Sequence, residues 1–104
     1  MLDAMNAIEL YMQDAPDRSE FITSGGLYQD AVARNIEIIG EAAGKVSRSL
    51  GDKYPNIPWI DISGMRNKII HEYANVDWEL VWEVATKDVK VLRKQMEDIL
   101  RAEL

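Results

Sequence analysis

Gly64-Met-Arg-Asn-Lys-Ile-Ile-His-Glu-Tyr73 is the stretch around which this 104-residue chain is organised, and it holds the only histidine, His71. If the stretch is helical, each residue advances about 100° around the axis. Arg66, Asn67 and His71 then share one side of the helix, and Tyr73 lies about 20° from Arg66. An apolar stripe adjoins that side and is formed by Ile62, Met65 and Ile69. The pattern predicts an anchored helix that presents a guanidinium, an amide and an imidazole together.

Periodicity alone leaves a second interpretation open, a surface histidine and arginine that are neighbours by chance. The rest of the chain has the apolar spacing of further helices, over residues 2–12, about 27–50, about 58–73 and 77 to about 99. The connection over residues 51–58 is expected to be irregular, and no strand pattern appears. The sequence therefore predicts one all-α domain over residues 1–104, an antiparallel bundle of four main helices, or five if one is broken.

Two glycines lie one turn apart in the second predicted helix. Gly40 and Gly44 each cost roughly 1 kcal/mol relative to alanine at an interior helix position. Such a pair indicates that another helix approaches closely at this point. The opposite edge is a charged row that runs from Asp30 to Arg48 and includes Arg34. Periodicity alone makes this row a solvated set of salt bridges.

Composition and charge limit the class of protein. The net charge of −6 argues against a general nucleic-acid binder. Residues 45–75 nevertheless carry five bases against three acids, so the segment that holds the motif is the cationic one. The chain has no cysteine, which excludes disulfides and thiolate metal sites. Neither a membrane span nor a signal peptide is recognisable, so we expect a cytoplasmic protein.

The chemistry open to the motif is acid–base catalysis beside a fixed positive charge. One histidine without clustered carboxylates does not make a metal site, so neither metal nor cofactor is expected. An imidazole can take or give a proton at neutral pH, and a guanidinium suits a phosphate whose charge grows in the transition state. RNA supplies its own nucleophile, the 2′-hydroxyl. Strand cleavage needs both a base and an acid, so one histidine per chain favours a two-fold dimer.

Arg66, four residues, His71, one residue and Tyr73 resemble the R-x4-H-x-Y signature of the HepT-like branch of the HEPN superfamily. Residues 29–43 (QDAVARNIEIIGEAA), 57–73 and 76–84 resemble the same family in its order and spacing, and the resemblance extends from residue 2 to residue 100. It implies a helical-bundle homodimer that acts as the toxin of a toxin–antitoxin pair and cleaves RNA without metal. The N-terminus looks short for the family by a few helical residues.

The resemblance also implies a role for each motif residue. Arg66 would hold phosphate, His71 would act as acid and base, and Asn67 would orient the substrate. Tyr73 would accept AMP from a partner minimal nucleotidyltransferase of the MntA type, the antitoxin, which silences the ribonuclease. Arg34 and Asn35 match another stretch of the family and are candidate substrate contacts.

Two alternatives remain open. One is a non-catalytic HEPN subunit that binds nucleotide or substrate for a nucleotidyltransferase, and the other is a bare structural bundle.

Overall fold

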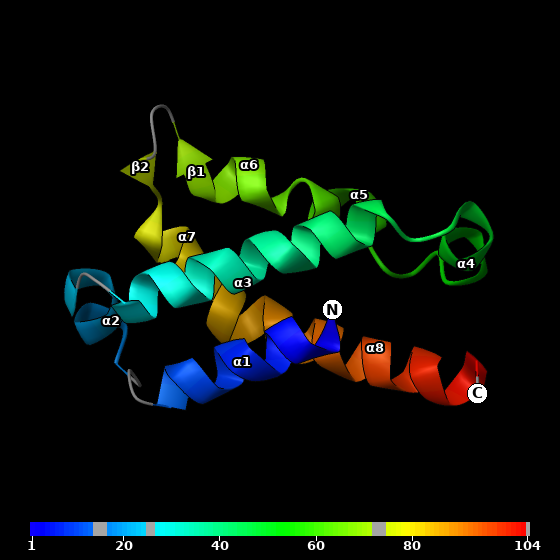
Figure 1. The fold of residues 1–104 in the computed structure, drawn as a ribbon, viewed down its shortest axis with the longest axis horizontal. Coiled ribbons are helices and arrows are strands. Elements are labelled where there is room, and N and C mark those ends of the chain that lie inside the picture. Colours follow the sequence, from blue (N-terminus) through cyan, green and yellow to red (C-terminus); the bar gives the residue numbers. More distant parts are fainter. Residues whose placement is uncertain (14–16, 25–26, 72–74, 104) are drawn as a thin grey trace.

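The chain folds almost entirely into helices in a computed structural model that describes residues 1–13, 17–24, 27–71 and 75–103 (Figure 1). The long helices are α1 (Leu2–Gln13), α3 (Leu27–Gly44) and α8 (Val89–Glu103). The short helices are α2 (Arg18–Ser24), α4 (Arg48–Lys53), α5 (Trp59–Ser63), α6 (Met65–Ile69), α7 (Trp78–Glu83) and the π-helix η1 (Val84–Asp88). Strands β1 (Ile70–His71) and β2 (Asn75–Val76) form one short antiparallel pair.

The main elements alternate in direction along the bundle. Figure 1 shows α3 in the middle, α1 along one side of it and α5 with α6 along the other. The continuous run of α7, η1 and α8 returns in the direction of α3. The predicted antiparallel bundle is therefore confirmed, with α5 and α6 as its broken member.

One cluster of buried apolar side chains fills the space between these helices. Helix α3 contributes its predicted face, in which Val32, Ile36 and Ile39 are at most 1% exposed. Helix α1 contributes Met5 and Ile8, which are fully buried. Burying a side chain of this size contributes about 1.5–3 kcal/mol of transfer free energy, so this face holds α3 in a fixed rotation. The residues on its opposite edge are consequently fixed toward solvent.

Aromatic packing closes the end of the bundle near α2. Phe21 is fully buried, and its ring centroid lies 6.4 Å from Trp78 and 5.7 Å from Trp82. Gln29 ties α2 to α3, because its amide donates to the carbonyl oxygens of Phe21 at 2.7 Å and Ile22 at 2.8 Å. Phe21 thus anchors the short helix α2 in the core.

Three predicted helices differ in extent from the observed ones, and the one predicted over about 58–73 is divided at Gly64 and ends at Ile69. The second ends at Gly44 instead of continuing to Leu50, because the Ser47 side chain accepts a hydrogen bond from Leu50 N at 3.2 Å and starts α4. Asp77, the first residue of the fourth predicted helix, is the N-cap of α7 and accepts a hydrogen bond from Leu80 N at 3.1 Å. The helix after Asp77 is interrupted by η1, a widened turn that the apolar spacing did not indicate.

Candidate functional site

Arg66 lies on a short helix that is held in the core by buried residues on its opposite side. Gly64 ends α5, and α6 begins at the next residue. Ile62 in α5 is 4% exposed and Ile69 in α6 is fully buried, so both helices are anchored in the core. The Arg66 side chain is 58% exposed. The guanidinium is therefore presented to solvent from an anchored support, as the sequence predicted.

The neighbouring helix α3 lies very close to this support. A Cβ atom on Gly40 would lie 3.1 Å from the Ile62 carbonyl oxygen and 3.5 Å from that of Ser63. The predicted close approach is thus confirmed, and α5 is the helix that makes it. The two segments run in opposite directions. Glu37 lies about one turn before Gly40 on α3, and Arg66 lies about one turn after Ile62 on the facing segment, so the two side chains come to the same place.

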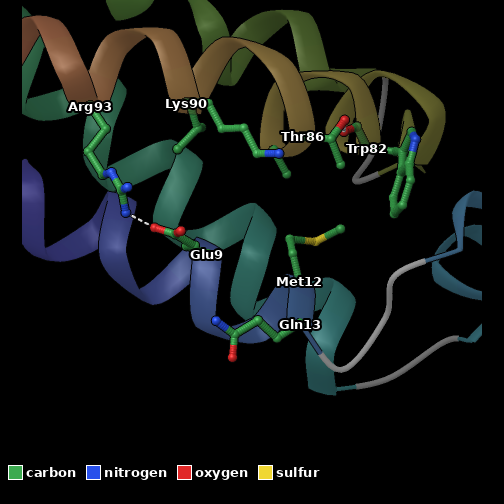
Figure 2. Close-up of a pocket in the computed structure, with 9 residues that line it drawn as sticks. Glu9, Met12, Gln13, Trp82, Thr86, Lys90 and Arg93 are labelled. Carbon is green, nitrogen blue, oxygen red and sulfur yellow. Dashed lines mark hydrogen bonds and ion pairs between the residues drawn. The ribbon is translucent and has the colours of Figure 1, made fainter.

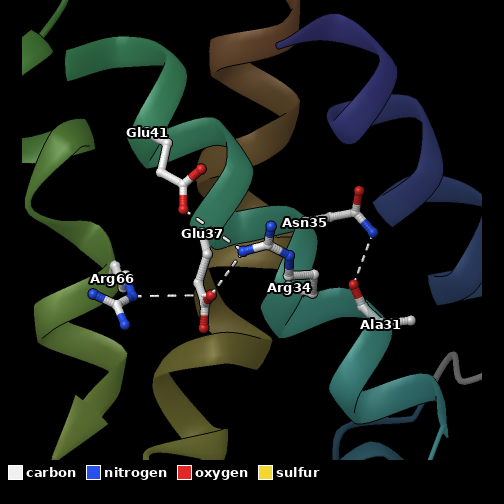
Figure 3. A network of polar contacts seen from close by, with 6 residues as sticks. All are labelled: Ala31, Arg34, Asn35, Glu37, Glu41 and Arg66. Atoms are coloured by element: carbon white, nitrogen blue, oxygen red, sulfur yellow. Dashed lines mark hydrogen bonds and ion pairs between the residues drawn. The ribbon is translucent and has the colours of Figure 1, made fainter. Parts of the chain in front are cut away.

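These two side chains meet in a small network of charges (Figure 3). Arg66 Nε lies 3.9 Å from Glu37 Oε2, and Arg34 Nη1 lies 3.3 Å from the same oxygen. Arg34 Nη1 also lies 3.6 Å from Glu41 Oε1. The Glu37 side chain is only 19% exposed, whereas those of Arg34 and Glu41 are 60% and 52% exposed. Two guanidiniums from different helices therefore converge on one half-buried carboxylate at an open surface.

The two candidate asparagines, Asn67 and Asn35, lie in different places relative to Arg66. Asn67 follows Arg66 on α6 and is exposed beside it. Asn35 lies on the side of α3 away from Arg66, and its Nδ2 donates to the Ala31 carbonyl oxygen at 2.8 Å (Figure 3). The structure brings Arg34 close to Arg66 but does not bring Asn35 there.

The helical wheel does not extend to His71, because α6 ends at Ile69. The Ile69 carbonyl oxygen accepts from Asp77 N at 2.7 Å, and Ile70 then pairs with Val76 and His71 with Asn75. The expected continuation of the helix is therefore wrong. Two consecutive β-branched isoleucines favour extended backbone here, and a partner segment is present to pair with it. The backbone of His71 is described but its side chain is not, and Tyr73 lies outside the described residues.

Glu37 is the residue of this site that the sequence analysis did not single out. It appeared only as one member of a charged row on α3. Its spacing of three residues from Arg34 indicated the first ion pair, and its spacing of three from Gly40 located it beside the close helix approach. The second pair, with Arg66, depends on how two helices are aligned and had no signal of its own.

Two hollows lie beside the helices. One of about 400 Å³ borders the motif helix through Met65 and Lys68 and continues along α8 past Val91 and Leu92. The other, of about 300 Å³, lies between α1 and α8, and Lys90, Trp82 and Met12 are among its lining residues (Figure 2). An ion pair between Glu9 and Arg93 closes one end of it (Figure 2).

Among the described residues, no three His, Cys, Asp or Glu side chains form a group that could hold a metal ion. A helix long and apolar enough to cross a membrane is likewise not found there.

Comparison with known proteins gives consistent matches. A family model described as "Ribonuclease HepT-like" matches residues 1–99. A protein of Methanocaldococcus jannaschii named "Putative RNase" is 38% identical over 101 residues, which is 97% of this chain and 85% of that protein. A protein of Thermococcus cleftensis named "Probable ribonuclease HepT" is 37% identical over 71 residues, 68% of this chain and 64% of that protein. No solved structure matches the chain.

Proposed function

The chain belongs to the HepT-like ribonuclease family, and from this premise we propose that it is a metal-independent endoribonuclease and the toxin of a toxin–antitoxin pair. The observation that carries the proposal is the position of Arg66. Its guanidinium is exposed on an anchored helix, five residues before the only histidine of the chain. Arg34 adds a second exposed guanidinium on the same surface. A phosphodiester can be held there by charge-assisted hydrogen bonds.

The reaction is an internal transfer of the phosphoryl group. The 2′-oxygen of one ribose forms a bond to the adjacent phosphorus while the bond from phosphorus to the 5′-oxygen breaks. His71 accepts the proton of the 2′-hydroxyl, and a second imidazole gives a proton to the departing 5′-oxygen. Arg66 stabilises the charge that builds up on the phosphoryl oxygens, and Asn67 orients the phosphate. The products carry a 2′,3′-cyclic phosphate and a 5′-hydroxyl.

A second copy of the chain supplies the second imidazole in this scheme. The 400 Å³ groove beside the motif helix supports a two-fold dimer at this place. Ile60 is 86% exposed on α5, whose Asp61 and Ile62 line the groove, and Val91 is 63% exposed in its wall. Exposed aliphatic side chains next to an apolar groove mark an interaction surface. A two-fold axis here would bring the two motif helices together.

For regulation we propose Tyr73 as the acceptor of AMP from a partner, because it occupies the tyrosine position of the family's R-x4-H-x-Y signature. The phenolic oxygen attacks the α-phosphorus of ATP, which is supplied by an MntA-type minimal nucleotidyltransferase, and pyrophosphate leaves. The tyrosine then carries AMP in phosphodiester linkage. Tyr73 is two residues from His71 in the sequence, so the added negative charge and the nucleoside are expected to hinder the approach of an RNA phosphate to the site.

Cleavage of RNA by the purified protein tests the proposal. Arg66→Ala and His71→Ala are each expected to lower the rate by about 10²–10⁴-fold, because each removes a group used in the transition state. Lys94→Ala is the control, since it removes a well-exposed base on α8 that does not line the groove and should cut RNA at nearly the wild-type rate. EDTA should leave the wild-type rate unchanged.

The alternative function is a non-catalytic subunit that binds nucleotide or substrate for a nucleotidyltransferase. It predicts RNA or nucleotide binding that Arg66→Ala weakens, with no cleavage by the wild type. Cleavage by the wild type at a rate that His71→Ala does not change would contradict the catalytic assignment of His71.

A further inference from the structure

Glu37 occupies an unusual place for an acidic residue in a site that is to bind phosphate. Its Oε2 atom lies 3.3 Å from Arg34 Nη1 on its own helix and 3.9 Å from Arg66 Nε on the neighbouring helix. Glu41, one turn further along α3, pairs with Arg34 at 3.6 Å, and no pair joins it to Arg66 among the described residues. A single carboxylate oxygen therefore connects the two guanidiniums.

The position of this carboxylate is fixed by the fold. Ile36 and Ile39, its neighbours on α3, are at most 1% exposed, so the rotation of the helix is set by the core. Gly40 allows α3 and α5 to lie this close together, because a Cβ atom at this position would lie only 3.1 Å from the Ile62 carbonyl oxygen. The Glu37 side chain is 19% exposed, against 52% for Glu41. A less exposed side chain has less rotamer freedom to lose when it forms an ion pair.

The atoms involved decide what the contact can do. An arginine has five N–H donors, one on Nε and four on the two Nη atoms. Glu37 lies at the Nε side of Arg66, and Figure 3 shows the two Nη atoms turned away from it. No ion pair or hydrogen bond joins these Nη atoms to another described residue, so they are available for an anion. Arg34 at the same time balances the negative charge of Glu37, which would otherwise repel phosphate.

We propose that Glu37 is a positioning residue, which aims the Nη groups of Arg66 at the phosphate by holding its Nε side, with Arg34 as the compensating charge. This inference rests on the proposed ribonuclease function. Both guanidiniums that pair with Glu37 are more than half exposed, so these ion pairs add little to stability and loss of Glu37 should affect the fold little. Its effect appears in the reaction, where a misplaced group costs up to about 10²-fold.

The test compares three single variants with the wild type and repeats one of them in an Arg66→Lys background. Glu37→Met keeps the length of the side chain but removes the acceptor, and it should lower kcat for RNA by between about 10-fold and 10²-fold, with a smaller change in KM. Glu37→Gln keeps an acceptor oxygen and should restore most of the rate. Glu41→Met, the matched control one turn away, should stay within about twofold of the wild type. In an Arg66→Lys background, Glu37→Met should cause little further loss, because lysine has no Nε–H for Glu37 to hold.

A second readout does not depend on cleavage. The Nε–Hε signal of Arg66, assigned by its absence in Arg66→Lys, should move in ¹⁵N spectra of Glu37→Met and stay near its wild-type position in Glu41→Met. If Glu37→Met cleaves RNA like the wild type and leaves this signal in place, the positioning role is wrong while the ribonuclease function stands. If the wild type cleaves no RNA, the proposed function fails, and the Nε–Hε signal alone still decides whether Glu37 holds Arg66.

Discussion

Replacing Gly40 by alanine tests the helix contact on which the site depends. The new Cβ would lie 3.1 Å from the backbone oxygen of Ile62, so α5 must move away by a few tenths of an ångström. Alanine gains roughly 1 kcal/mol of helix propensity over glycine. Overpacking of this kind costs about 1–3 kcal/mol, and a backbone oxygen on an anchored helix cannot rotate aside. Gly40→Ala should therefore lower the free energy of unfolding by up to about 2 kcal/mol. The movement of α5 should also move Arg66 away from Glu37.

Gly44→Ala is the matched control, because it lies one turn along the same helix and its Cβ would meet the nearest atom, Ser63 Cβ, at an ordinary 3.8 Å. This variant should be as stable as the wild type or more stable, by up to about 1 kcal/mol. Thermal and urea unfolding measure the stability of both variants. A difference of 1 kcal/mol in the free energy of unfolding corresponds to roughly 4–8 °C in Tm for a domain of this size. A Gly40→Ala protein as stable as Gly44→Ala, with an unchanged rate of RNA cleavage, would refute the reasoning.

Three further predictions concern assembly, regulation and pH. Ile60→Asp should convert the dimer to monomer in sedimentation at micromolar concentration and abolish cleavage; a wild type that sediments only as monomer would contradict the dimer. Tyr73→Phe should stay toxic in cells and escape silencing by the partner nucleotidyltransferase, whereas loss of toxicity in the folded variant would place Tyr73 in the catalytic set. The hydrogen bond from Lys53 to Glu103 lowers the pKa of Glu103 below its usual 4.5, and a hydrogen bond from Tyr54 adds to this. The stability from that contact is present above pH 4.5 and is lost as the pH falls through the lowered pKa. The Tm difference between the wild type and Glu103→Gln should therefore shrink on acidification. A difference that stays constant with pH would refute the assignment.

Local signals in the sequence predicted much of the fold. The apolar faces of α1 and α3, the Asp77 cap and the close approach at Gly40 follow from patterns within one or two helical turns. The end of α3 was missed because the apolar spacing continues through Val46 and Leu50. Ser47 could have indicated it, since serine is a favoured N-cap residue.

Long-range contacts account for what the sequence did not predict. The motif helix stops at Ile69 because the chain returns to pair with it, and Asp77 N reaches the Ile69 carbonyl. Glu37 meets Arg66 because α3 and α6 are aligned by packing around Gly40. Neither event can be read from periodicity, since each depends on segments that are distant in the sequence. The place of Arg66 on an anchored helix was predicted, and its partner was not.

Analysis of the ends of the RNA products tests the central claim most directly. Purified wild-type protein is incubated with a defined single-stranded RNA in the presence of EDTA, and the termini of the fragments are identified by mass spectrometry. The wild type and Lys94→Ala are expected to leave 2′,3′-cyclic phosphate and 5′-hydroxyl ends, whereas Arg66→Ala and His71→Ala are expected to leave the RNA uncut. Fragments with 3′-hydroxyl and 5′-phosphate ends, or intact RNA with the wild type, would contradict the claim.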